Sequence, residues 1–288
     1  MLTEIDRVLL ATPDAAGAAE KWRALLGAVE IGKDRVASLS ARRITLRAGN
    51  SDIEFLEPDG EGLLADELKR RGRAHLFAAG ASSPQAASAA HLAERSGADV
   101  QAYGDAYLVT IKIEGAPIRF VISPESFRYA AGDINFLYEA TILAKDQASA
   151  VDQIAYVFAL DKSHFTTITS EAFGYTGVLT LFREGALHRF EVITPTDMTK
   201  TMGRYYAHEG CSFYMAFAES AAILDIERMV RVSKAGITVD RPPTRAEDRP
   251  ADQLWLHPPT LGGMMLGISR PSMAWKWSGH PERVEILA

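Results

Sequence analysis

One structural pattern recurs four times along the chain, and this repeat constrains the fold more than any other feature of the sequence. In each copy an alternating apolar run leads to a helix, and strand-like segments follow the helix. The last segment of each copy is an apolar stretch that ends at a proline, and these four stretches occupy residues 53–58, 119–124, 190–195 and 266–271. The chain is therefore predicted to contain four β-α-β-β-β units.

The four expected helices have recognisable first residues. Asp14, Ser83, Asp146 and Ser220 each precede a run of apolar residues at helical spacing. Side-chain oxygens of Asp and Ser accept hydrogen bonds from the free amides of a first helical turn, so these residues favour helix starts. Gly27 follows the first run, where a glycine in the left-handed conformation commonly ends a helix.

The composition excludes several classes of protein. The 288 residues carry a net charge of -6 without a dense basic run, which argues against nucleic acid as a partner. No apolar stretch has the length of a membrane span, and the first residues include acids where a secretory leader needs bases, so a soluble cytoplasmic protein is expected. Cys211 is the single cysteine, which leaves no disulfide within the chain. No glycine-rich nucleotide motif is present.

Four β-α-β-β-β units in two pairs resemble the vicinal oxygen chelate superfamily. This superfamily includes glyoxalase I, methylmalonyl-CoA epimerase, extradiol dioxygenases and bleomycin-resistance proteins. The resemblance spans residues 5–271, and residues 256–266 are similar to a His-Pro…Gly-Gly stretch of the epimerase-like branch. It implies an α+β fold of two cupped sheets, or glyoxalase-like half-barrels, in domains 1–126 and 133–271.

The resemblance also implies where a metal would bind, because family members place ligands on the opening and closing strands of each unit. The corresponding residues are Arg7, Glu54, His75 and Phe120 in the first pair, and Glu139, Glu191, Ser212 and Gly267 in the second. Carboxylate and imidazole ligands suit one divalent ion, such as iron, manganese, nickel or zinc. Glu139 and Glu191 would hold it, with Glu54 and His75 as the weaker alternative site. Arg7 opposes a cation, so Glu54 and His75 could instead complete a buried ion-paired network.

Glu139 and Glu191 are also the candidate catalytic residues on chemical grounds. If both side chains face one apolar cup, burial raises the pKa of at least one of them and creates a general acid or base. The alternative is that one of them faces solvent, since an error of one residue in a strand inverts every assignment. The residues expected around the substrate are His164, His188, Ser212, Tyr214 and His257. His257 adjoins a proline, where a structural role in a turn is the alternative.

The segment after the last expected strand contains two tryptophans, Trp275 and Trp277, and is too apolar for a free end. We expect residues 272–288 to dock over a cavity mouth or against a partner subunit, and the second arrangement would make a homodimer. Aromatic residues are also frequent in the second pair, as in a small-molecule pocket.

The favoured hypothesis is a glyoxalase-like lyase or isomerase that acts on a small oxygenated, hydrophobic or aromatic compound. It would use metal-assisted or carboxylate acid/base chemistry in the second pair. A non-catalytic binding protein, similar to the drug-resistance members, is the alternative. An extradiol dioxygenase is the third hypothesis. The metal-binding His, His and Glu of that class would fall on Glu139, Ser212 and Gly267, and two of these three residues cannot serve as ligands.

Overall fold

The computed structural model describes residues 1–287, which form two eight-stranded curled sheets with six α-helices. The strand order is β2-β3-β4-β1-β5-β8-β7-β6 in the first sheet and β10-β11-β12-β9-β13-β16-β15-β14 in the second. The opening strands of two units are antiparallel neighbours at the centre of each sheet. Each opening strand is also parallel to the closing strand of its own unit. The predicted α+β fold of two paired-unit sheets is confirmed.

The first half comprises β1 (Ile5–Ala11), α1 (Ala15–Leu26), β2 (Val29–Val36), β3 (Ala41–Ala48), β4 (Ser51–Pro58), α2 (Leu63–Arg71), β5 (His75–Ser83), α3 (Ala86–Arg95), β6 (Asp99–Tyr103), β7 (Ala106–Ile113) and β8 (Ala116–Pro124). The second half comprises β9 (Phe136–Leu143), α4 (Gln147–Phe158), β10 (Thr166–Ser170), β11 (Tyr175–Leu181), β12 (Arg189–Pro195), α5 (Thr201–Glu209), β13 (Ser212–Glu219), α6 (Ile223–Val232), β14 (Ile237–Asp240), β15 (Gln253–Leu256) and β16 (Met265–Ser269). Short 3₁₀ turns precede β3, β10 and β16 and occur in the C-terminal segment.

The two aspartates cap their helices as predicted. Asp14 accepts a hydrogen bond from the amide of Gly17, and Asp146 accepts one from the amide of Ser149. The two serines act earlier in the chain. Ser83 is the last residue of β5, and α3 begins at Ala86; Ser220 lies three residues before α6. Their hydroxyls accept from the amides of the turns that lead into the helices, so they position these helices without capping them.

Helices α2 and α5 are additions that the repeat did not predict. Each connects the closing strand of one unit with the opening strand of the next. Both lie against the inner face of their sheet, which is the face that carries no α1, α3, α4 or α6. Leu64 of α2 is buried against the inner face of the first sheet, and Met202 of α5 packs on the inner face of the second. These helices therefore influence how much space remains inside each cup.

The other four helices share one continuous apolar core with the outer faces of both sheets, and this core joins the two halves. Phe120 lies at its centre, in edge-to-face contact with Phe158, Phe190 and Phe213 of the second half. The sequence placed Phe120 at an inward position, and this was wrong. On β8 the alternation turns Val121 inward, one residue away from the expected site.

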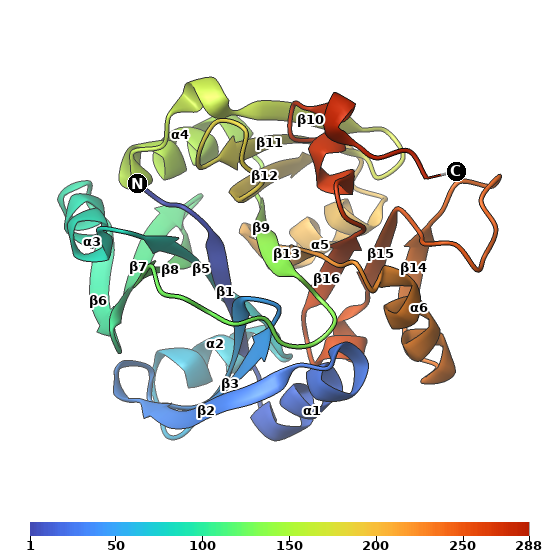
Figure 1. Cartoon of the computed structure of the whole chain (residues 1–288). Helices are drawn as coiled ribbons and strands as arrows, with labels where there is room; N and C mark the ends of the chain where they lie inside the picture. Colours follow the sequence, from blue (N-terminus) through green and yellow to red (C-terminus); the bar gives the residue numbers. More distant parts are fainter. Residues whose placement is uncertain (288) are drawn as a thin grey trace.

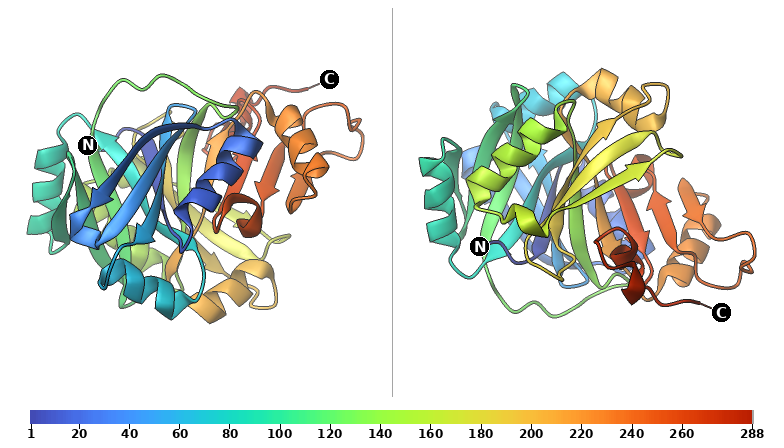
Figure 2. Two further views of the ribbon diagram at one scale, coloured as in Figure 1. Left: turned by 90° about the horizontal axis from the view of Figure 1, so that it is seen from below. Right: turned by 90° about the horizontal axis from the view of Figure 1, so that it is seen from above.

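Strands β1 and β9 contact each other in the middle of the molecule, with the later units arranged around them (Figure 1). The connection between the halves, residues 125–135, runs across the outside of the molecule (Figure 2). No helix among residues 1–287 is long and apolar enough to cross a membrane.

Candidate functional site

A cavity of about 150 Å³ opens on the inner face of the second sheet. Its floor is formed by strands β9, β12 and β13, and its walls by β10, β11 and β15 together with α5 and the C-terminal segment. The lining residues are Tyr138, Glu139, Ile168, Thr169, Ser170, Phe173, Tyr175, Leu179, Arg189, Glu191, Ile193, Met202, Met215, Phe217, Gln253, Trp255 and Trp277. We call this space the inner cavity. Six of the lining residues are aromatic, so it combines apolar walls with a few polar groups, as small-molecule sites do.

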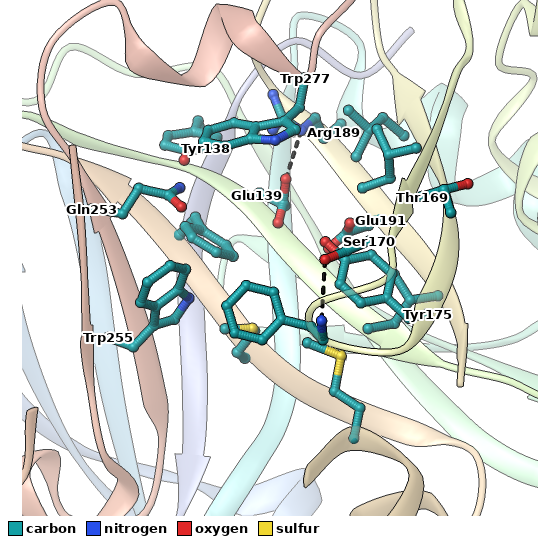
Figure 3. A pocket seen from close by; sticks show the side chains of 17 residues that line it. Tyr138, Glu139, Thr169, Ser170, Tyr175, Arg189, Glu191, Gln253, Trp255 and Trp277 are labelled. Carbon is teal, nitrogen blue, oxygen red and sulfur yellow. Dashed lines mark hydrogen bonds and ion pairs between the residues drawn. The ribbon is translucent and has the colours of Figure 1, made fainter. Parts of the chain in front are cut away.

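The charged groups that line the inner cavity, Glu139, Arg189 and Glu191, come from β9 and β12 and lie close together (Figure 3). Glu139 and Arg189 are opposite each other in the register of these strands, and Nε of Arg189 donates to Oε2 of Glu139 at 2.7 Å. Both side chains are almost inaccessible to solvent. Glu191 lies two residues beyond Arg189 and therefore faces the same side of the sheet. The strand register thus brings two carboxyl groups and one guanidinium group onto one wall.

Thr141 links the two carboxyl groups. Its hydroxyl oxygen is 2.7 Å from Oε2 of Glu191 and 3.1 Å from Oε1 of Glu139. A hydroxyl has a single proton and can donate to only one carboxylate. The arrangement is fully satisfied when Glu191 carries a proton and donates it to Thr141, while Thr141 donates to Glu139. The geometry therefore favours a neutral Glu191.

Electrostatics favour the same protonation state. Burial raises the pKa of Glu191 well above its ordinary value of 4.5, and the negative charge of Glu139 raises it further. Burial also raises the pKa of Tyr138 and Tyr175, which have carboxyl neighbours as the second cause. The inner cavity thus presents a carboxyl group that favours its protonated form, beside a carboxylate that is paired with Arg189.

The corresponding carboxylate in the first half is enclosed by cations. Glu54 accepts from Nη1 of Arg7 at 2.9 Å and from Nη1 of Arg43 at 3.1 Å, and the hydroxyl of Tyr103 donates to it as well. Apolar side chains of the inner face, including Phe77, pack beside this network. The first cup is consequently filled by its own side chains around Glu54.

His75 is not part of the Glu54 network. Its Nδ1 lies 2.9 Å from the carbonyl oxygen of Arg73, and its Nε2 has no hydrogen-bond partner among the described residues. Burial, followed by the positive charge of Arg71, lowers the pKa of His75 to about 4. Glu54 and His75, the two ligands of the alternative metal site, therefore do not belong to one network. Glu54 is already bound by two arginines.

The residues of the second half do not fit a divalent metal either. Arg189 occupies one oxygen of Glu139, and its positive charge opposes a second cation beside it. The inward positions on β13 and β16 hold Met215 and Gly267, which are not ligands for a hard or borderline ion. Among residues 1–287, no three His, Cys, Asp or Glu side chains are grouped as a metal site requires.

The predicted residues Glu139 and Glu191 line the inner cavity, and the five residues predicted around the substrate lie outside it. His188 lies at the junction of the halves, where Nδ1 accepts from the amide of Ile5 at 3.0 Å. Burial, followed by the charge of Arg189, lowers its pKa to about 3. His164 belongs to the 3₁₀ turn before β10 and lies 3.7 Å from Asp161.

Ser212 is buried, and its hydroxyl donates to the carbonyl of Gly210. The register explains its absence from the inner cavity. Met215 pairs with Met265 on the adjacent closing strand, as Glu139 pairs with Arg189, so Met215 occupies the position equivalent to Glu139.

Tyr214 and His257 line a second depression that adjoins the inner cavity. The imidazole of His257 is 2.9 Å from the hydroxyl of Thr238, and the amide of His257 donates to the carbonyl of Gly236. These contacts fix the turn before β16.

Sequence reasoning missed two residues of the site, and it named a third, Trp277, only within a segment expected to dock over a cavity mouth or against a partner subunit. Arg189 could have been found, because it is two residues from Glu191 on one strand and must share its face. Thr141 stands in the same relation to Glu139. Trp277 belongs to the C-terminal segment and lines the inner cavity, while the neighbouring Ser278 accepts from Nη1 of Arg189 at 2.7 Å. No sequence pattern indicated which surface this segment covers.

Comparison with known proteins places this arrangement in a wider context. No protein-family model matches the chain, and no curated protein matches its sequence. Among solved structures, a mutant of 4-hydroxymandelate synthase from Streptomyces coelicolor is similar with a TM-score of 0.71 and 15% identity, over 94% of this chain and 93% of that one. The catechol dioxygenase BphC is similar with a TM-score of 0.61 and 10% identity, over 94% and 87% of the two chains.

A fusion of a xylose isomerase-like TIM barrel with 4-hydroxyphenylpyruvate dioxygenase is also similar, with a TM-score of 0.62 and 12% identity, over 94% of this chain and 49% of that one. At these identities the likeness concerns the fold. The fold that the sequence resemblance implied is therefore found, and these structures share it over most of the chain. The chain therefore has the fold of the vicinal oxygen chelate superfamily.

Proposed function

We propose that the second half is an enzyme site that moves a proton on a small, oxygenated aromatic or hydrophobic compound, in an isomerase or lyase reaction without a metal. The observation that carries this proposal is the linked set Glu191, Thr141 and Glu139 on the wall of the inner cavity. Two carboxyl groups in one site with different protonation states are the usual basis of general acid/base catalysis.

The size and lining of the inner cavity support the choice of substrate. A cavity of about 150 Å³ is the size that accommodates a single benzene ring in a protein interior. Trp255, Phe173 and Phe217 can contact the flat faces and edges of such a ring. The similar structures include, by name, a 4-hydroxymandelate synthase and a catechol dioxygenase, and both names refer to hydroxylated aromatic compounds.

The proposed chemistry follows from the protonation states. Glu191 donates its proton to the carbonyl oxygen of the bound compound, while the Glu139 carboxylate accepts the proton that the neighbouring carbon loses, so that a neutral enol forms. Thr141 can pass a proton between Glu191 and Glu139, so the pair can be restored without solvent. Arg189 holds Glu139 in place, and the aromatic walls with Trp277 exclude water.

Proton exchange in heavy water tests this proposal before the product is known. Phenylacetone and 2-hydroxyacetophenone would be incubated with the protein in D₂O, and loss of the signal of the C–H beside the carbonyl would be followed by proton NMR. We expect the protein to accelerate exchange and Glu191→Gln to reduce the acceleration about 100-fold or more, with unchanged affinity for the ketone. Glu184→Gln, at an exposed site outside the cavity, is the matched control and should leave the rate unchanged.

A non-catalytic binding protein is the second candidate, and one observation favours it. Both carboxyl groups are already satisfied inside the protein, by Arg189 and by Thr141. The same experiment separates the two functions. Ketones that bind without any acceleration of exchange, with equal affinity for the Glu139→Gln/Glu191→Gln double variant, would refute catalysis and establish binding.

A further inference from the structure

A larger depression adjoins the inner cavity and is unused in the proposed chemistry. It has a volume of about 730 Å³, and we call it the outer groove. Its lining residues are Ala172, Phe173, Thr199, Lys200, Thr201, Met202, Arg204, Tyr214, Met215, Thr238, Trp255, His257, Pro258, Pro259 and Met265. Phe173, Met202, Met215 and Trp255 line both spaces. The two spaces therefore adjoin at these four side chains, two of which are flexible methionines.

The charges in the outer groove have one sign. Lys200 and Arg204 are its charged lining residues, and none of its lining residues is an Asp or a Glu. Lys200 donates to the carbonyl of Glu171, and Arg204 donates to the carbonyl of Thr199. Neither cation forms an ion pair with a carboxylate among residues 1–287, although the carboxylate of Asp197 lies near enough to interact with the charge of Lys200. The residues that line the outer groove thus carry two positive charges and no negative charge, which attracts an anion to this surface.

The inner cavity offers no free positive charge. Its guanidinium group is already paired with Glu139, and Glu191 favours the neutral form, so the inner cavity does not attract an anion. A ligand with one anionic end would therefore be oriented by charge alone, with its uncharged end inside and its anion outside. The two adjoining volumes, about 150 Å³ and about 730 Å³, together leave room for a ligand larger than one ring.

We propose that the natural ligand is elongated, with a ring-sized uncharged head in the inner cavity and an oxyanion, carboxylate or phosphate, held in the outer groove by Lys200 and Arg204. This inference rests on the proposed function of the inner cavity and adds the substrate class. The tail crosses between the two spaces beside Trp255 and Phe173. Lys200 and Arg204 act here as binding residues, because they would touch the ligand far from the reacting atoms.

Matched neutral and anionic probes test this inference. The probes are ω-phenylalkanols, ω-phenylalkanoates and ω-phenylalkyl phosphates with linkers of increasing length, and binding is followed by quenching of tryptophan fluorescence. Trp255 lies between the two spaces and reports on both. We expect short anions to bind no better than alcohols, and longer anions to bind about tenfold more tightly. The comparison of carboxylates with phosphates identifies the preferred oxyanion.

The tighter binding of long anions should also depend on the salt concentration and on Lys200 and Arg204. Raising KCl from about 20 mM to about 500 mM should reduce it several-fold, because partly exposed charges are screened. The Lys200→Gln/Arg204→Gln variant should lose it while its affinity for alcohols is retained. The matched control is Lys162→Gln/Arg183→Gln, which removes two cations outside the outer groove and should preserve the preference.

The outcomes separate this inference from the proposed function. Alcohols that bind while anions of every length bind no better would overturn the elongated ligand and leave the inner cavity as proposed. An anion preference that survives in Lys200→Gln/Arg204→Gln would place the anion elsewhere and overturn the inference. Failure of every alcohol and every anion to bind would refute the proposed function of the inner cavity, and the inference with it.

Discussion

Replacing Glu191 by Gln is expected to make the protein more stable at neutral pH. The folded chain holds the pKa of Glu191 above the ordinary value of 4.5, through burial and the charge of Glu139. Below this value the carboxyl group is protonated in both the folded and the unfolded chain, so the titration contributes nothing. As the pH rises above 4.5, the unfolded chain releases the proton while the folded chain retains it. The wild type therefore loses stability as the pH rises towards the folded pKa.

The magnitude follows from the linkage relation. While only the folded form is protonated, the free energy of unfolding falls by about 1.4 kcal/mol for each pH unit. Gln has the shape of a protonated Glu, and its amide can donate to Thr141 as the carboxyl proton does. The Glu191→Gln variant lacks this titration, so its advantage over the wild type should be small near pH 4.5 and should grow by about 1.4 kcal/mol per pH unit above it.

Urea denaturation at pH 5.5, 6.5 and 7.5 provides the measurement, with fluorescence and circular dichroism as the two probes. Equal m values for the two proteins would show that the same surface unfolds in both. The exposed Glu184→Gln variant is the control and should follow the wild type at each pH. A stability difference that stays constant with pH, or a variant that becomes progressively less stable than the wild type, would refute the neutral Glu191 on which the proposed chemistry depends.

Three further predictions concern neighbouring features. Arg189→Met should lower the free energy of unfolding at pH 7 by about 3–5 kcal/mol, because Glu139 would remain buried without its partner. Adding Glu139→Gln to this variant should recover most of that loss, and urea denaturation of the two variants tests both expectations. Gly267→Ala should weaken the binding of phenylalkanols measured by fluorescence, because the added Cβ would lie 2.1 Å from the Phe217 ring and push it into the inner cavity. An unchanged affinity would contradict that packing. His188→Gln should reduce the loss of stability in acid. The pKa of about 3 keeps the imidazole of His188 neutral in the folded chain, while the unfolded chain binds a proton below about pH 6.5. Between pH 6 and 4 the wild type should therefore lose about 1.4 kcal/mol per pH unit more than the variant. Parallel curves for the two proteins would show that His188 does not carry this dependence.

The repeat in the sequence was sufficient to predict the fold, because each unit carries its own local signals. Asp14 and Asp146 cap helices at the positions expected from their side chains. Closing strands that end at a proline lie beside the opening strands of their own units. Helices α2 and α5 were not predicted, because they belong to the connections between units and follow no repeated pattern.

The sequence left open whether Glu139 and Glu191 share one face, and the pairing of β9 with β12 places both on the inner face. Alternation along single strands also failed where strands depart from regular pairing. The register between β9 and β13 shifts between Phe213 and Met215. Ser212 is the first residue of β13, and the position equivalent to Glu139 lies three residues further on, at Met215, beyond this shift of register, which is not visible in an apolar pattern.

Only the tertiary structure decided which of the two cups stays open. Glu54 and Glu191 occupy equivalent places in sequences of the same type, four residues before a proline. Arg43 and Tyr103 come from other strands and close around Glu54, whereas Arg189 binds Glu139 and leaves Glu191 on a cavity wall. The space inside a cup depends on the volumes and charges of side chains that distant strands bring together. A pattern along one strand specifies the direction of a side chain. The neighbours of that side chain across the sheet determine whether the space around it is filled or is available to a ligand.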